Sequence, residues 1–137
     1  MNVARRLCAA TLAVAFGLVV VSRCNAAESG LEGAWLQDGA CAETFSRAGK
    51  GFAFKKPVNV FAPAFIITGN RLRTPTASCS IKAVKTVGDR RVLSLQCATT
   101  VAVEDVRAIV ALSSDGALLR YLNDQDAGGS RYGRCSL

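Results

Sequence analysis

Six cysteines and a complete lack of histidine set the chemistry that this chain can carry out. Without histidine, a Ser-His-Asp or Cys-His catalytic site cannot be built, and histidine-ligated metals are excluded. No pair among Cys41, Cys79, Cys97 and Cys135 has Cys-x-x-Cys spacing, which disfavours a zinc ribbon or a thioredoxin-type site. We therefore expect structural cysteines, no cofactor, no metal and no enzymatic activity.

A pair of carboxylates, Asp124 and Asp126, is the next set of residues that could do chemistry. Carboxylates two residues apart ahead of Gly128 and Gly129 could bind calcium or a sugar. The calcium-loop pattern with its terminal glutamate is absent, however. Because Asp, Asn and Gly are turn-forming residues, the sequence favours a solvated turn over a binding site here.

Basic residues gather between residues 71 and 91. This stretch holds six of them and a single acidic residue, Asp89. This stretch predicts a candidate anion-binding face, for an envelope polymer, lipid headgroups or an acidic protein. The alternative is that the charges serve solubility and protect a sheet edge. Nucleic acid is disfavoured as a partner, because the chain is only 7% aromatic and carries an export signal. The six residues are Arg71, Arg73, Lys82, Lys85, Arg90 and Arg91.

Hairpin patterns must position these residues. Ala64–Thr68 and Arg71–Thr74 flank the dipeptide Gly69-Asn70, which is typical of a two-residue hairpin turn. With Thr68 opposite Arg71, the apolar side chains fall on one face. The predicted facing pairs are Ile67 with Leu72 and Phe65 with Thr74.

A second hairpin is expected between Ser78–Thr86 and Arg90–Thr99, around Val87-Gly88-Asp89. One register places the apolar residues on a single face, and it also places Cys79 opposite Cys97. Four cysteines allow three connectivities, and this register selects the Cys79–Cys97 bond, which leaves Cys41 to pair with Cys135. The predicted facing pairs are Lys85 with Arg91, Ala83 with Leu93, Ile81 with Leu95, and Cys79 with Cys97.

A third hairpin is expected between Val106–Leu112 and Ala117–Leu122. Val106, Ala108, Val110 and Leu112 alternate along the first strand, and we expect Leu119 and Tyr121 to face them. A helix over Val103–Leu112 is the alternative, because Glu104 and Asp105 would suit a helix N-terminus. The β-branched content favours the strand.

The N-terminus has the three parts of a secretory signal: Arg5 and Arg6, an uncharged run of 15 residues from Leu7 to Val21, and a small-residue exit at Ala26-Ala27. The run is short for a membrane anchor, and Arg23 ahead of Cys24 is wrong for a lipoprotein signal. We expect cleavage after Ala26. Losing the three arginines of residues 1–26 would lower the net charge from +7 to +4.

Together these patterns predict an all-β fold, a small antiparallel meander closed as a barrel or stacked as a sandwich, after a cleaved N-terminal signal helix. Residues 1–26 form the signal and residues 27–137 form a single disulfide-bridged β domain. Paired cysteines place it outside the cytoplasm, in the periplasm or secreted. A Cys41–Cys135 bond would tie the first strand to the last and favours closure.

Gly33-Ala34-Trp35, followed by a meander, resembles the Gly-x-Trp motif on the first strand of calycins, the group of lipocalins, avidins and small bacterial metalloprotease inhibitors. The inhibitor resemblance extends to a nearby cysteine, Cys41, and to the length. Those inhibitors typically have one disulfide, whereas this chain offers two. The segment Phe61–Thr76 is similar to small exported bacterial proteins of uncharacterised activity.

The function expected from the sequence is an exported, non-enzymatic binding or inhibitory module for an unknown protein or envelope component. The alternative is a structural envelope protein whose basic face adheres to anionic polymer or membrane. The aromatic side chains could line a cavity in a barrel of this size, which has room for one small ligand, or they could fill the core.

Overall fold

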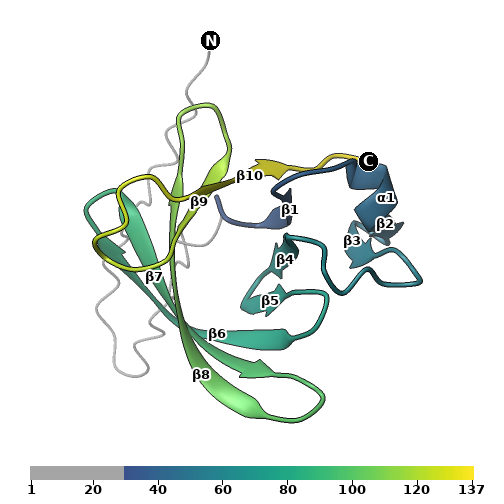
Figure 1. Cartoon of the computed structure of the whole chain (residues 1–137), viewed down its shortest axis with the longest axis horizontal. Coiled ribbons are helices and arrows are strands. Elements are labelled where there is room, and N and C mark those ends of the chain that lie inside the picture. Colours follow the sequence, from purple (N-terminus) through teal and green to yellow (C-terminus); the bar gives the residue numbers. More distant parts are fainter. Residues whose placement is uncertain (1–29) are drawn as a thin grey trace, which may run out of the picture.

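A computed structural model describes residues 30–137, which fold as an antiparallel meander (Figure 1). Eight of the strands in this part of the chain close into a barrel in the order β1-β10-β9-β8-β7-β6-β5-β4, with β4 pairing back onto β1. The barrel strands are β1 (Gly33–Leu36), β4 (Ala64–Thr68), β5 (Arg71–Arg73), β6 (Ser78–Val87), β7 (Arg90–Ala98), β8 (Val103–Leu112), β9 (Leu118–Tyr121) and β10 (Ser130–Arg134).

The expected all-β meander is confirmed, and of the two architectures it is the closed barrel that forms. Consecutive strands from β4 to β10 pair in order, so short turns suffice to connect most of them. Strand β1 fills the remaining place between β4 and β10 and removes the open edge there. None of the described residues form a helix long and apolar enough to cross a bilayer.

The first predicted hairpin, β4–β5, has the expected register. Thr68 pairs with Arg71 and Ile67 pairs with Leu72. Gly69 has φ 57°, the left-handed conformation that a two-residue turn needs and that glycine adopts without steric cost. Strand β5 ends at Arg73, so the expected pair of Phe65 with Thr74 is not part of the ladder.

The second hairpin, β6–β7, follows the predicted register only in its half next to the cysteines. Cys79 pairs with Cys97 and Ile81 with Leu95, but the register then shifts between Ile81 and Ala83. Beyond this β-bulge, Val84 replaces Ala83 as the partner of Leu93. The predicted Ala83–Leu93 and Lys85–Arg91 pairs are therefore wrong, because a bulge adds one residue to one strand and changes which side chains face inward.

The same bulge shortens the turn. The hairpin closes through Gly88 and Asp89 alone, with Val87 opposite Arg90. Gly88 has φ 63°, so a tight two-residue turn forms here in place of the expected three residues. One extra residue in the strand and one fewer in the turn leave the Cys79–Cys97 pairing unchanged.

The third hairpin, β8–β9, is a strand pair, and the alternative helix over residues 103–112 does not form. The prediction that Leu119 and Tyr121 share a face with Val110 and Leu112 is wrong. Tyr121 lies opposite Ile109 and Leu119 lies opposite Ala111, on the outer face of the barrel. The inward residues of β9 are Leu118 and Arg120. Two adjacent leucines allowed either alternation, and the pairing with β8 selects the one that buries Leu118.

The barrel core contains three aromatic rings, Trp35, Phe65 and Tyr132, packed among aliphatic side chains. The Phe65 ring centre lies 6.5 Å from that of Trp35 and 5.0 Å from that of Tyr132. Trp35 is fully buried, and its Nε1 donates a hydrogen bond of 2.9 Å to the Leu31 carbonyl. This hydrogen bond fixes the segment that precedes β1, and that segment covers one end of the barrel.

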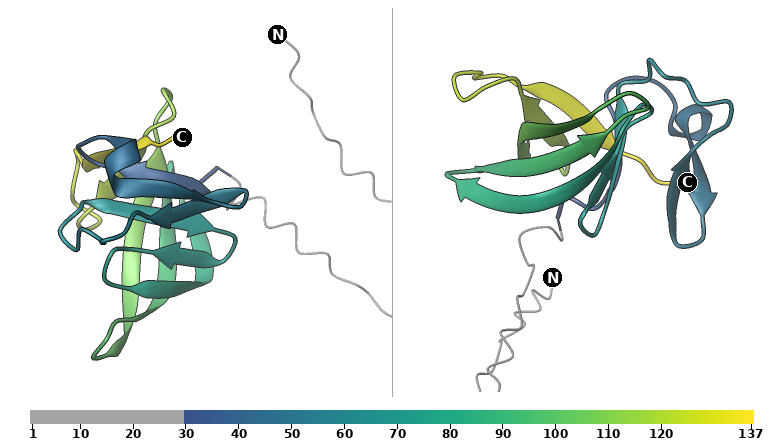
Figure 2. Two further views of the ribbon diagram at one scale, coloured as in Figure 1. Left: turned by 90° about the vertical axis from the view of Figure 1, so that its right-hand side faces the viewer. Right: turned by 90° about the horizontal axis from the view of Figure 1, so that it is seen from below.

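A small satellite stands beside the barrel, formed by α1 (Cys41–Thr44) and the hairpin of β2 (Phe45–Ala48) and β3 (Gly51–Phe54) (Figure 2). Its phenylalanines pack against the outer face of β1 and β4 and make a second apolar cluster. Arg73 on β5 donates a hydrogen bond of 2.8 Å to the Phe52 carbonyl. The phenylalanines of this segment therefore pack together in a core.

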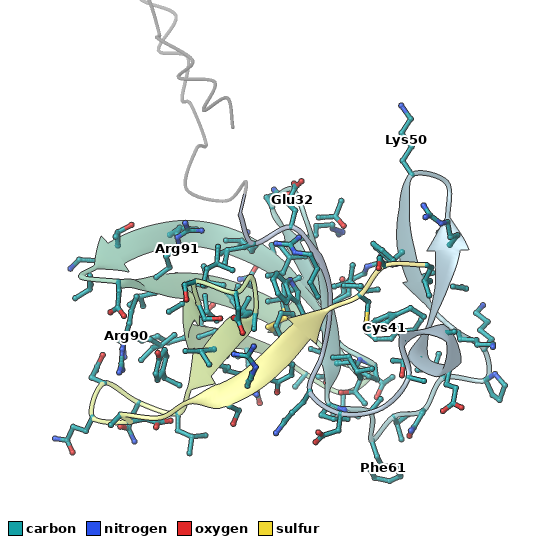
Figure 3. The ribbon with its side chains drawn as sticks, turned by 90° about the horizontal axis from the view of Figure 1, so that it is seen from above. Glu32, Cys41, Lys50, Phe61, Arg90 and Arg91 are labelled. Carbon is teal, nitrogen blue, oxygen red and sulfur yellow. A yellow bond between two sulfur atoms is a disulfide. The ribbon has the colours of Figure 1, made fainter. Side chains whose placement is uncertain are left out.

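Both disulfides pair as the hairpin register predicts. Cys79 bonds Cys97 across β6 and β7, and Cys41 bonds Cys135 across a sequence separation of 94 residues. The second bond joins the satellite to the residue that follows β10 (Figure 3). Two disulfide bonds indicate an oxidising compartment outside the cytoplasm. The predicted signal, residues 1–26 with Cys24, lies outside the described residues.

Candidate functional site

The barrel wall is incomplete beside β8, because β8 is much longer than β9. Val103–Ala108 pair with β7, whereas β9 pairs with β8 only from Ile109 onward. Figure 1 shows β8 continuing past the end of β9 toward the bottom of the view. This half of the barrel is therefore open, and side chains that point inward from β8 here reach solvent: Val106 is 38% exposed.

A hollow of about 390 Å³, which we call the cup, occupies this open end. Residues of β4 to β9 line it, together with the segment before β4 and the turns at the open end. Its lining residues are Val60, Ala62, Pro63, Ala64, Phe65, Ile67, Leu72, Thr74, Pro75, Thr76, Ala77, Cys79, Leu95, Cys97, Thr99, Glu104, Val106, Ala108, Val110 and Arg120. Most of them are apolar, so the cup can exclude water from a ligand.

The Cys79–Cys97 disulfide is part of the cup wall. It lies among Leu72, Leu95 and Phe65, all of them buried in the barrel core. A disulfide in this position holds β6 to β7 next to the opening, where β8 lacks a second neighbour. It therefore fixes the wall of the cup directly beside the uncovered part of β8, where Cys97 pairs with Glu104.

Two charged residues border the cup, Arg120 on β9 and Glu104 on β8. Both are exposed and both occupy inward-facing positions, since Arg120 pairs with Val110 and Glu104 with Cys97. They do not pair with one another, as the ion pairs found within residues 30–137 are Arg107–Asp124 and Arg131–Asp115. Arg120 can therefore offer a charge-assisted hydrogen bond to a ligand at the mouth of the cup.

A short turn holds the rim of the cup between β5 and β6. The Thr74 hydroxyl oxygen accepts hydrogen bonds from the N–H groups of Thr76, at 3.3 Å, and Ala77, at 3.0 Å. The Thr74 N–H donates to the Ala77 carbonyl at 2.9 Å. Local bonds of this kind order a turn without help from neighbouring elements, so this side of the mouth is preformed.

The opposite end of the barrel is closed. Leu31 is 1% exposed and covers the core there, and the Arg134 guanidinium lies 4.4 Å from the centre of the Trp35 ring. Arg91 points inward at this end, because it pairs with the buried Val110. A Cβ added to Gly30 would lie 3.8 Å from an Arg91 nitrogen. A ligand can therefore reach the cup only from the open end.

The six basic residues of the candidate anion-binding face do not share one surface. Arg91 points into the barrel, whereas Arg90 is on the outer side of β7, 3.6 Å from the centre of the Tyr121 ring (Figure 3). Arg90 also donates a hydrogen bond of 2.7 Å to the Asp126 carbonyl, and this bond ties it to the β9–β10 loop. Four residues remain on the outside of β5 and β6: Arg71, Arg73, Lys82 and Lys85.

The carboxylates of the β9–β10 loop make structural bonds. Asp124 forms an ion pair with Arg107 at 3.0 Å, which lowers the pKa of Asp124. Asp126 accepts hydrogen bonds from the N–H groups of Leu122, Gly128 and Gly129, and the bond from Leu122 contributes most to lowering its pKa. These bonds build the turn that the sequence predicts. In residues 30–137, no three His, Cys, Asp or Glu side chains gather closely enough to hold a metal ion.

A second depression, of about 560 Å³, lies beside β1 and β10. Its lining is mostly polar side chains and glycine: Gln37, Asp38 and Gly39 from the loop after β1, and Arg131 and Gly133 from β10. Arg131 is already paired with Asp115. The cup is the better candidate site, because it combines an apolar lining with a charged residue that has no ion-pair partner among residues 30–137.

Sequence reasoning identified the two cysteines of the cup wall but not its other functional residues. The alternation of Val106, Ala108 and Val110 was visible, and all three do point inward. These residues border an opening because β9 ends early, and the sequence pattern does not predict where β9 ends. Arg120 could have been noticed as the one charge between Leu118 and Tyr121.

Comparisons with protein-family models, with curated proteins and with solved structures found no match to this chain. The molecule is an eight-stranded antiparallel β-barrel, and its candidate site must be interpreted from its own geometry.

Proposed function

We propose that this protein is a non-enzymatic binding protein that holds one small, mainly apolar ligand in the cup. The observation that carries the proposal is the hollow of about 390 Å³ in the open end of a barrel whose other end is closed. Ligand sites in proteins are typically concave, mostly apolar and about 300–1,000 Å³ in volume. The cup falls at the lower end of that range, which fits a single small ligand.

The lining indicates which part of the ligand lies where. Apolar side chains such as Leu72, Leu95 and Val110 surround the deep part of the cup, where a polar group without a partner would be costly. Arg120 at the mouth favours a ligand that carries its acidic or hydrogen-bond-accepting group at the exposed end. Glu104 borders the same opening and would oppose a second anionic group.

Export and family membership belong to the same proposal. The disulfides require an oxidising compartment, and the signal pattern of residues 1–26 adds a route to the periplasm or the medium. Trp35 of the Gly-x-Trp motif is on the first barrel strand and is fully buried. That placement supports the calycin resemblance, and a calycin-like binding protein is the form of the proposal that we favour.

The test is a titration with a neutral fluorescent probe such as N-phenylnaphthylamine. Wild-type protein should enhance its fluorescence at one saturable site. Ala108→Phe places a ring in the cup and should reduce the affinity about tenfold or more. Val103→Phe is the matched control, because Val103 lies on the same strand but faces outward and is 68% exposed. Equal loss in the two variants, or no saturable site in wild type, would count against the cup.

Adhesion to an anionic surface remains the second candidate. The observation in its favour is the outer surface of β5 and β6, where Arg71, Lys82 and Lys85 are exposed. They form no ion pair with any residue that the structure describes. The two functions differ in their response to salt, because screening weakens contacts between exposed charges and leaves apolar burial nearly unchanged.

A further inference from the structure

The uncovered edge of β8 is a second surface that could bind another molecule, through its main-chain groups. Val103–Ala108 pair with β7 on one side, and no strand of residues 30–137 pairs with them on the other. Six residues of strand span about 20 Å. An edge of this length presents a row of main-chain N–H and C=O groups that another extended chain can satisfy.

The side chains along this edge alternate in a definite way. Glu104, Val106 and Ala108 point inward and line the cup. Asp105 and Arg107 point outward, and the Arg107 guanidinium is exposed apart from its ion pair with Asp124. A strand added to the edge would therefore send alternate side chains into the mouth of the cup and the others outside.

A second copy of this chain does not fit the edge. A two-fold pairing of antiparallel strands sets residues of the same face opposite each other, so it centres on one residue. Centring it on Glu104, Asp105 or Arg107 places that charge opposite its own copy. Like charges directly opposite each other destabilise a strand pair.

Centring the pair on Val103 sets the β7–β8 turn of one copy against the strand of the other, and centring it on Ala108 overlaps the part of β8 that β9 covers. The remaining register for two copies centres on Val106. It brings Val103 of the second copy to the position beside Ile109, which Tyr121 of β9 already occupies. The β7–β8 turn of that copy would then meet β9. The edge therefore rejects its own copy by charge or by overlap, while its backbone groups remain open to a chain with a different pattern.

We propose that this edge binds an extended segment of a partner polypeptide as an added antiparallel strand. Complementary charge specifies the segment: an acidic residue opposite Arg107 and a basic residue opposite Asp105. An apolar residue between these two lies opposite Val106 and points into the cup. The proposal depends on the edge alone, and it holds whether or not the cup also takes a free small ligand.

The test uses capped synthetic hexapeptides and wild-type protein residues 27–137, followed by calorimetry or fluorescence anisotropy. The matched peptide reads apolar, acidic, apolar, basic, basic, polar along the strand. The exchanged peptide has its acidic residue and its first basic residue swapped. The matched peptide should bind, and the exchanged peptide should bind about tenfold more weakly, because both outer pairs become repulsive.

Two further arms separate strand addition from other modes of binding. The doubly exchanged variant D105R/R107D should reverse the order of the two peptides. Both side chains are exposed, so we expect the variant to fold. A matched peptide with N-methyl groups on its edge-facing amides keeps every side chain but loses the main-chain hydrogen bonds, and it should not bind to wild type.

Equal affinity for the matched and exchanged peptides would overturn the proposal. So would undiminished binding of the N-methylated peptide, or no binding of the matched peptide. Asp124→Asn is the control for the intramolecular pair, because it frees Arg107 without changing the edge; it should leave the matched affinity equal or higher. Failure of the fluorescent probe to bind in the cup would leave these results unaffected, so the two proposals fail separately.

Discussion

Single residues in the β9–β10 loop illustrate how this barrel uses its carboxylates. Asp126 ties three main-chain N–H groups of the loop together, and the loop in turn holds Arg90 over Tyr121. The sequence indicated a turn here from Asn, Asp and Gly. It could not indicate that Arg90, from a distant hairpin, would be recruited to the loop and removed from the basic surface.

The lowered pKa of Asp126 has a consequence for stability. A carboxyl whose pKa is lower in the folded state contributes stability above its unfolded pKa of about 3.9, and that contribution is lost as the pH falls through the folded value. We expect thermal melts of wild type to be level near neutral pH and to fall below about pH 4. Asp126→Asn should melt lower at neutral pH and show a smaller acid-induced fall.

Asp105→Asn is the matched control for this experiment, because the Asp105 carboxylate makes no hydrogen bond or ion pair with residues 30–137. Its melting curve should follow that of wild type at each pH. Parallel curves for wild type and Asp126→Asn, measured by circular dichroism from neutral pH to about pH 2, would show that the loop carboxylate does not contribute in this way.

The strands and their turns were largely predictable, and the failures have physical causes. Alternation and glycine turns located all three hairpins. The bulge after Ile81 was not predictable, because Ala83 and Val84 are both apolar and either could face Leu93. Only the closed barrel decides which one does. The cup was not predictable either, since it depends on the lengths of β8 and β9 relative to each other, a property of the whole sheet.

The disulfides give a prediction at the scale of elements. In the chain-entropy model, a bond that closes the 94-residue separation stabilises by about 4.7 kcal/mol, against about 3 kcal/mol for the 18-residue one. Replacing Cys41 and Cys135 by Ser should therefore lower the melting temperature more than replacing Cys79 and Cys97.

The shorter disulfide has a second role that separates the two pairs. Cys79 and Cys97 line the cup, so their replacement should weaken binding of the fluorescent probe at temperatures where the protein is still folded. Replacement of Cys41 and Cys135, which join the satellite to the chain end, should not weaken it. The reverse order in melting temperature would contradict the entropy argument, and equal probe affinities would contradict the structural role of the cup disulfide.

For the molecule as a whole, the uneven charge suggests contact with anionic surfaces. The variant R71E/K82E/K85E reverses three exposed charges on the outside of β5 and β6. If this surface adheres to anionic vesicles or polymer, wild type should bind at low ionic strength and release as salt rises. The variant should not bind, although its melting temperature should be close to that of wild type.

A matched control comes from the satellite hairpin. Lys50 projects from its tip, away from the barrel (Figure 3), and Lys50→Glu changes charge without touching β5 or β6. Lys82→Glu is its partner, because both single variants change the net charge equally. Equal loss of vesicle binding in Lys82→Glu and Lys50→Glu would indicate a general effect of net charge. No binding by wild type at low salt would leave the basic residues with a solubility role alone.

The central claim, that a small apolar ligand occupies the cup, is tested most directly by methyl NMR during titration with N-phenylnaphthylamine. Strands β7 and β8 provide an internal control, because their inward methyl groups line the cup and their outward ones do not. We predict that the resonances of Leu95, Val106 and Val110 shift on binding, while those of Val92 and Ile109, on the outer face, stay in place. Shifts confined to the outer methyl groups, or equal on both faces, would contradict the account.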